Sequence, residues 1–169
     1  MSYRDPTYVI FDGDTDQWAY RFMRGWRANS RLDFDFRDAH DIGPMTARAQ
    51  DERYVKDQLT KRMAASAAVL VLVGERTKWL YKFVRWELEL ALDLDLAIIA
   101  VSLANKRMPN LQLIPPIICD RCFLNVTFQM RIIQFALDHF PPAFRRFSSA
   151  TRAEGGRFYN DEIYRSVGL

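Results

Sequence analysis

The run Ala67–Val73 (AAVLVLV) constrains the fold more than any other segment of this chain. It is apolar at every position, rich in β-branched valine, and ends at Gly74. A strand that is apolar on both faces needs cover on both, as at the centre of a parallel sheet between two layers of helices. A second such run follows at Ala97–Leu103 (AIIAVSL), so we expect a parallel sheet at the centre of the molecule.

Helix and strand patterns alternate along the rest of the chain. Tyr8–Phe11 (YVIF) predicts a buried strand closed by a tight turn at Asp12–Asp14, and the alternation of Leu32, Phe34 and Phe36 predicts an edge strand. Apolar periodicity predicts four helices, over about 14–29 with Trp18, Phe22 and Trp26 in the core, and over Asp51–Ala65, Lys78–Leu94 and Val126–Phe140.

This order of elements implies right-handed βαβ units and a flavodoxin-like α/β fold, with a doubly wound parallel sheet of four to five strands. We expect a single domain over residues 1–140 and a C-terminal extension over 141–169 that packs on the domain or on a partner. Ligands of such sheets bind beyond the carboxyl ends of the strands. Three polar segments are expected on that rim: Asp12–Asp14, Arg37–Asp41 and Gly74–Lys78.

Glu87 occupies the middle of the apolar stripe of the helix predicted over Lys78–Leu94. At about 100° per residue, Phe83, Val84 and Ala91 fall within roughly 60° of it. A buried carboxylate loses hydration worth several kcal/mol unless it is paired, hydrogen-bonded or open to a cleft. Two interpretations stay open: a functional carboxylate that faces a ligand, or a structural one that pairs with an arginine or caps a backbone group.

Charge and cysteine content exclude several classes of protein. The net charge of +3 comes from basic residues scattered among nearly as many acids, so we expect no nucleic-acid partner. Cys119 and Cys122 form one CxxC, but His40 and His139 are remote in sequence; we predict two reduced thiols and no metal site. The N-terminus has neither a signal peptide nor a membrane span, and a cytoplasmic protein is expected.

Three blocks of sequence carry a resemblance to a known family. They are YVIFDGDTD at the first strand, FDFRDAHD at the second, and AAVLVLVGERTKWLYKFVRWELELALDLDLAIIAVSL across the centre. Over about residues 7–140 the chain resembles the TIR-like domain family of bacterial Thoeris antiphage defence proteins, which share a variant of the flavodoxin-like fold. The central block is the specific one, with a strand that ends in glycine, a short polar loop, and an aromatic residue four positions before a glutamate.

The resemblance implies that Glu87 acts on NAD, at the bond between nicotinamide and ribose, and that Phe83 is the aromatic residue one turn earlier. It also implies a nucleotide pocket at the loop after the first strand, with Phe11, Asp12, Gly13 and Asp14 as candidates. Each has a structural alternative: core packing for Phe11, a tight turn for Gly13, a helix cap for Asp14.

Three further candidates have equally plausible structural roles. Arg37 and Asp38 end the second predicted strand, where Arg37 is suited to a pyrophosphate or to a surface salt bridge. Trp79 is suited to the pocket mouth or to core packing, whereas Trp86 is expected to pack on a neighbouring element.

The resemblance leads to two hypotheses for function. The first is an NAD glycohydrolase or ADP-ribosyl cyclase that uses NAD as substrate, needs no cofactor, associates with itself, and makes a diffusible nucleotide signal for a separate effector. The second is a non-catalytic module that works by assembly or nucleotide sensing, because a flavodoxin-like fold alone never implies catalysis.

Overall fold

The computed structural model describes residues 6–32, 34, 36–38, 52–79 and 83–169, without the side chains of Arg37, Asp38, Glu52, Val55 and Phe83. The strands are β1 (Pro6–Ile10), β2 (Arg37–Asp38), β3 (Ala68–Val73), β4 (Ala97–Ser102), β5 (Phe123–Thr127) and β6 (Gly156–Phe158). The helices are α1 (Gln17–Ala28), α2 (Glu52–Ala64), α3 (Phe83–Asp93), α4 (Pro116–Cys119), α5 (Met130–Phe144), α6 (Ser149–Arg152) and α7 (Asp161–Ser166), and a 3-10 turn, η3 (Thr77–Trp79), precedes α3.

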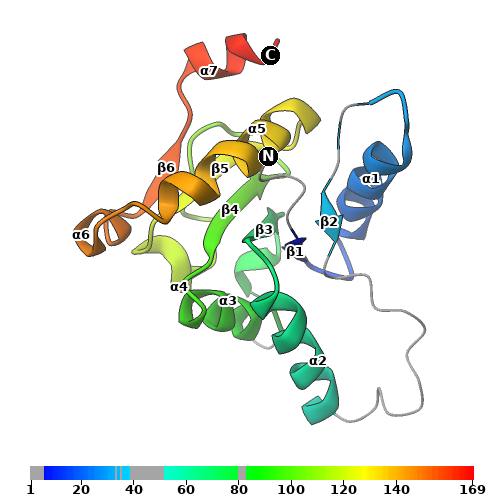
Figure 1. The fold of residues 1–169 in the computed structure, drawn as a ribbon, viewed down its shortest axis with the longest axis vertical. Helices are drawn as coiled ribbons and strands as arrows, with labels where there is room; N and C mark the ends of the chain where they lie inside the picture. Colours follow the sequence, from blue (N-terminus) through cyan, green and yellow to red (C-terminus); the bar gives the residue numbers. More distant parts are fainter. Residues whose placement is uncertain (1–5, 33, 35, 39–51, 80–82) are drawn as a thin grey trace.

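The strands form one parallel sheet in the order β2-β1-β3-β4-β5-β6 (Figure 1). The first five have the flavodoxin-like order 2-1-3-4-5, which confirms the predicted fold class. The sixth strand, β6, comes from the residues after 141 and pairs with β5. The sheet therefore has one strand more than the four or five expected.

Helices cover both faces of the sheet, because successive side chains of its central strands point to opposite sides. Val9 and Leu70 belong to a core cluster with α1 and α5, whereas Tyr8 and Val69 belong to a second cluster with α2 and α3. All residues of β3 and β4 are buried, as their continuous apolar runs predict. Helix α3 thus lies on the Tyr8 face of the sheet (Figure 1).

The edge strand predicted from Leu32, Phe34 and Phe36 was placed too early. The ladder with β1 begins at Arg37, after the alternating residues. Phe34 and Phe36 are nevertheless buried; their rings contact each other, and Phe34 also contacts the ring of Trp26. Their alternation therefore reflects packing into an aromatic cluster and not strand pairing.

The helix predicted over Val126–Phe140 was also displaced. Val126 lies in β5, and α5 runs from Met130 through Pro141 and Pro142 to Phe144. Buried Asn125 interrupts the apolar run of β5 and hides its strand character; its amide donates to the carbonyls of residues 106 and 107, at 2.9 Å each. The prolines are accommodated in the last turns of a helix whose aromatic face is buried.

Trp18 and Phe22 of the aromatic ladder of α1 are not in the core, contrary to expectation, whereas Trp26 packs against it. Trp18 is 46% exposed and Phe22 is 58% exposed. The face of α1 that packs on the sheet consists of Ala19, Tyr20 and Met23. The four-residue spacing of the ladder marks a helix face correctly but does not say which face turns inward.

The residues after α5 pack on the first cluster of the core. Tyr164 of α7 is fully buried, and its hydroxyl accepts a hydrogen bond from the backbone N–H of Thr127 at 3.2 Å. Arg152 of α6 forms an ion pair with Asp95 and donates to the carbonyl of Phe144 at 3.0 Å. Among the described helices, none is both long and apolar enough to span a membrane.

Candidate functional site

The carboxyl ends of β1 and β3 meet where the chain leaves the sheet in opposite directions. Helix α1 follows β1 on one face and α3 follows β3 on the other, so their connecting loops diverge from a common crevice. In open parallel sheets this switch point is the usual ligand site. The loop after β1 begins with Phe11 and Asp12, and the loop after β3 begins with Gly74.

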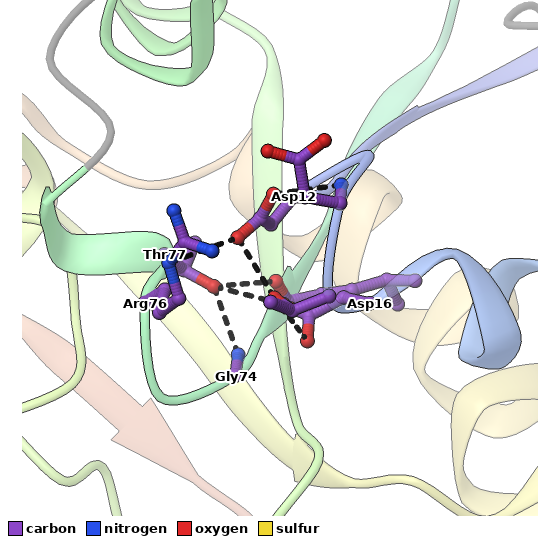
Figure 2. A network of polar contacts seen from close by, with 8 residues as sticks. Asp12, Asp16, Gly74, Arg76 and Thr77 are labelled. Carbon is purple, nitrogen blue, oxygen red and sulfur yellow. Dashed lines mark hydrogen bonds and ion pairs between the residues drawn. The ribbon is translucent and has the colours of Figure 1, made fainter.

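Asp12 organises the loop after β1 (Figure 2). Its Oδ1 accepts the backbone N–H of Asp14 at 2.9 Å, and its Oδ2 accepts the hydroxyl of Thr15 at 2.7 Å. The Nε of Arg76, from the loop after β3, lies 3.9 Å from Oδ2. Asp12 is therefore a buried acceptor that fixes its own turn and meets a cation from the neighbouring loop.

Asp16 makes the second link between the two loops. The hydroxyl of Thr77 accepts the N–H of Gly74 at 2.9 Å and lies 3.3 Å from Oδ2 of Asp16 (Figure 2). A Cβ on Gly74 would overlap the Asp16 carboxylate, so any larger residue there would have to displace that side chain. Asp16 occupies the N-cap position of α1 but makes no side-chain capping bond, because its carboxylate is engaged in this network.

The surroundings of the two carboxyl groups shift their pKa values in opposite directions. Burial raises the pKa of Asp16, and the nearby Asp12 adds to this rise against the hydrogen bonds from Thr15 and Thr77. Burial also acts on Asp12, but hydrogen bonds from Thr15 and Asp14 and the charge of Arg76 outweigh it and lower the pKa. The pKa of Asp12 is thus lower than that of Asp16.

Arg76 is the cation of this rim, and sequence reasoning did not single it out. It lines a cavity of about 340 Å³ together with Asp16 and Gly74, and Leu103 and Leu113 contribute an apolar wall. A volume of this size suits part of a nucleotide. The sequence feature that could have identified Arg76 is its position two residues after the glycine that ends the central strand.

Glu87 lies one turn into α3 and is 6% exposed, as its place in the apolar stripe predicts. The hydroxyl of Tyr8, on β1, donates a hydrogen bond to its Oε1 at 2.6 Å. Among the described residues this phenol, and not an arginine, is the partner of the carboxyl group. Glu87 is therefore a buried carboxyl without a described counter-cation.

Burial raises the pKa of Glu87 to about 7, and the hydrogen bond from Tyr8 opposes that rise. The group therefore changes charge near neutral pH, which is uncommon for a glutamate and frequent at functional sites. A hollow of about 280 Å³ adjoins the first turn of the same helix, lined by Lys78, Val84, Arg85 and Ile117 among others.

The structure assigns definite surroundings to four other predicted residues. Phe11 stacks on Tyr20, with ring centroids 4.7 Å apart, and packs against the core. Gly13 and Asp14 are exposed, and a Cβ on Gly13 would have open space. Trp79 is 60% exposed under the ammonium of Lys78, so it is not a core residue.

The remaining predicted residues are only partly described. The side chains of Phe83, Arg37 and Asp38 lie outside the described part, as do residues 39–41 of the predicted rim segment. Strand register puts the backbone of Arg37 beside Pro6, at the start of β1. It is therefore about 13 Å below the rim expected for it, because each strand residue advances about 3.3 Å.

Two other predictions concern the cysteines and the packing of Trp86. Cys119 and Cys122 are both free, as predicted, and they belong to opposite faces of the sheet. Trp86 packs against the second core cluster under the ammonium of Lys56 from α2, also as predicted. Within the described ranges, no group of three or more His, Cys, Asp or Glu side chains is arranged to hold a metal ion.

Comparison with known proteins identifies the family to which this region of the chain is similar. Residues 8–108 match the family model described as Thoeris protein ThsB, TIR-like domain. No curated protein matches the chain. The matched region covers more than half of the chain and includes Tyr8, the Asp12–Asp16 loop, Arg76 and Glu87. The chain therefore belongs to the TIR-like domain family of the Thoeris protein ThsB, a family of antiphage defence proteins.

Proposed function

We propose that this protein is an NAD-cleaving enzyme of Thoeris antiphage defence and that Glu87 is its catalytic carboxylate. The observation that carries the proposal is a glutamate buried in an apolar core with a phenol, and no described cation, as its partner. Maintaining such a group costs folding free energy. A purely structural role does not require a carboxyl group in an apolar core, whereas stabilisation of a developing positive charge requires a carboxylate held close to it.

The chemistry follows from the charge that develops on the substrate. Cleavage of the bond between C1′ of the ribose and the nicotinamide nitrogen returns the electron pair to the ring, which leaves as neutral nicotinamide. The ribose becomes an oxocarbenium-like cation, and an ionised Glu87 stabilises it. Water then attacks C1′ and loses a proton to give ADP-ribose, or a nucleophile within the same molecule closes a ring.

Other residues would shape the substrate pocket in this proposal. Asp12 and Gly13 offer a fixed turn with an exposed backbone, and Arg76 offers a cation for a phosphate at the same rim. Phe83 and Trp79 would supply aromatic contacts near the start of α3. Arg37 and Asp38 remain predicted substrate ligands.

The product would act as a diffusible nucleotide signal on a separate effector of the defence system. We also propose cytoplasmic action and self-association, because a pocket of this kind can be completed by a second subunit.

A non-catalytic assembly or sensing module is the second candidate function. The exposure of Glu87 favours it, because 6% leaves little of the side chain open to a ligand. In that case the Tyr8–Glu87 hydrogen bond would serve only to join β1 to α3.

Nicotinamide release separates the two candidates. Purified protein is incubated with NAD, with and without extract from phage-infected cells, and products are separated by chromatography for wild type and Glu87→Ala. The enzyme proposal expects release by wild type in at least one condition and loss of at least 100-fold in the variant, as for removal of a main electrostatic stabiliser. Equal release by both proteins would remove Glu87 from the mechanism.

A further inference from the structure

The partner of Glu87 comes from the sheet and not from its own helix. Tyr8 lies in β1, and its backbone is held in register with Val69 of β3. Its side chain is fully buried in the second core cluster, and its hydroxyl reaches Oε1 of Glu87 across 79 residues of sequence. A phenol fixed by a central strand has little freedom to move, so it sets where that oxygen can lie.

Packing alone does not require this hydroxyl. Phenylalanine would fill the same apolar space, and burial of an OH group is unfavourable unless it is hydrogen-bonded. The O···O separation of 2.6 Å is that of a short hydrogen bond from the phenol to the carboxyl oxygen. The hydroxyl of Tyr8 therefore binds the carboxyl group of Glu87, in addition to the packing of the ring in the core.

Charged groups on two of the elements around Glu87 have other partners. On α3, Arg85 pairs with Glu89 on the exposed side, at 2.9 Å. On α2, Lys56 lies over the indole of Trp86, 5.5 Å from its centre. Within the described part of the chain, Tyr8 of β1 is the group that contacts the Glu87 carboxyl. Its hydrogen bond opposes the rise in the pKa of Glu87 that burial causes.

We propose that Tyr8 is a positioning residue for the reaction: its hydroxyl holds Oε1 of Glu87 in place, which leaves Oε2 as the oxygen that acts on the ribose. This inference rests on the proposed function, because it assigns the two oxygens of Glu87 different tasks. Tyr8 itself need not touch the substrate. Its effect is on the orientation and the charge of the carboxylate.

Tyr8→Phe tests the proposal with two independent readouts. The first is a 13C NMR titration of the Glu87 side-chain carboxyl, which needs no substrate. The second is the pH profile of kcat/KM for nicotinamide release, which reports groups of the free enzyme. We expect both apparent pKa values to move upward by about one unit, because a hydrogen bond to the ionised form is lost. Activity at pH 7 then falls about fivefold and recovers toward pH 9.

Tyr164→Phe is the matched control, because Tyr164 is also fully buried with a hydrogen-bonded hydroxyl but lies in α7. It should shift neither the titration nor the profile. An unchanged Glu87 titration in Tyr8→Phe would overturn the inference, as would an unshifted profile in an active enzyme. If the titration moves but wild type releases no nicotinamide at any pH, the proposed function fails while the Tyr8–Glu87 coupling stands.

Discussion

The protonation state of Glu87 affects both the stability of the fold and the proposed activity. The pKa of Glu87 in the folded protein, about 7, lies above its ordinary value of 4.5. Between pH 4.5 and pH 7 the side chain therefore binds a proton when the protein folds. The stability that comes with this proton is fully present below pH 4.5 and is lost as pH rises through 7. The ionised form, which the proposed chemistry needs, is thus the form that the fold tolerates least.

Glu87→Gln should therefore stabilise the protein at alkaline pH. The wild type is expected to lose about 3 kcal/mol of unfolding free energy between pH 4.5 and pH 9 from this group, whereas the variant has no proton to lose. Denaturant unfolding at pH 5 and pH 9 measures the difference, with Glu89→Gln, on the exposed side of the same helix, as the control. A stability gap that does not grow with pH would contradict the burial of an ionisable Glu87.

At the scale of elements, the loops after β1 and β3 behave as one unit. The hydrogen bond from Thr77 to Asp16 and the ion pair of Arg76 with Asp12 join them, and the absence of a Cβ at Gly74 makes room for the Asp16 carboxylate. Two loops whose linking residues, Asp16 and Thr77, are 61 positions apart thus define a single rim. The close approach of the two loops places Arg76 beside Asp12.

Gly74→Ala should displace Asp16 and loosen this rim. We expect a loss of about 1–3 kcal/mol in unfolding free energy, as for overpacking at a tight site, together with a higher KM for NAD. Gly13→Ala is the control for stability: it meets open space, and its cost should stay within about 0.5 kcal/mol. If Gly74→Ala is as stable as Gly13→Ala, the rim is not held as described.

Local patterns predicted much of this arrangement but not its long-range contacts. The strands β3 and β4 and the burial of Glu87 follow from apolar runs and helical spacing, which depend only on neighbouring residues. The Tyr8–Glu87 bond joins positions 79 apart, and no local pattern encodes it. The strand β5 was missed because Asn125 breaks its apolar run, although its amide is satisfied by backbone carbonyls.

At the scale of the whole molecule, the residues after α5 complete the core. Helix α7 inserts Tyr164 into the cluster that also contains α1 and α5, and β6 extends the sheet beyond β5. The family match ends at residue 108, so this closure of the core lies outside the matched region. The extension thus shares a hydrophobic core with α1 and α5.

Tyr164→Ala should therefore destabilise the entire domain in a single transition. Removal of a large buried aromatic side chain typically costs 3–5 kcal/mol. Denaturant unfolding followed by tryptophan fluorescence measures this loss. Phe158→Ala, at a position 47% exposed on β6, is the control and should cost much less. Two separate transitions would instead indicate that the extension folds on its own.

The most direct test of the central claim is nicotinamide release by Glu87→Gln at pH 8, beside wild type in the same assay. The account predicts a variant that is more stable than wild type yet releases nicotinamide at least 100-fold more slowly, so that unfolding cannot explain the loss. Wild-type rates from this folded variant would contradict the assignment of Glu87 as the group that stabilises the ribosyl cation.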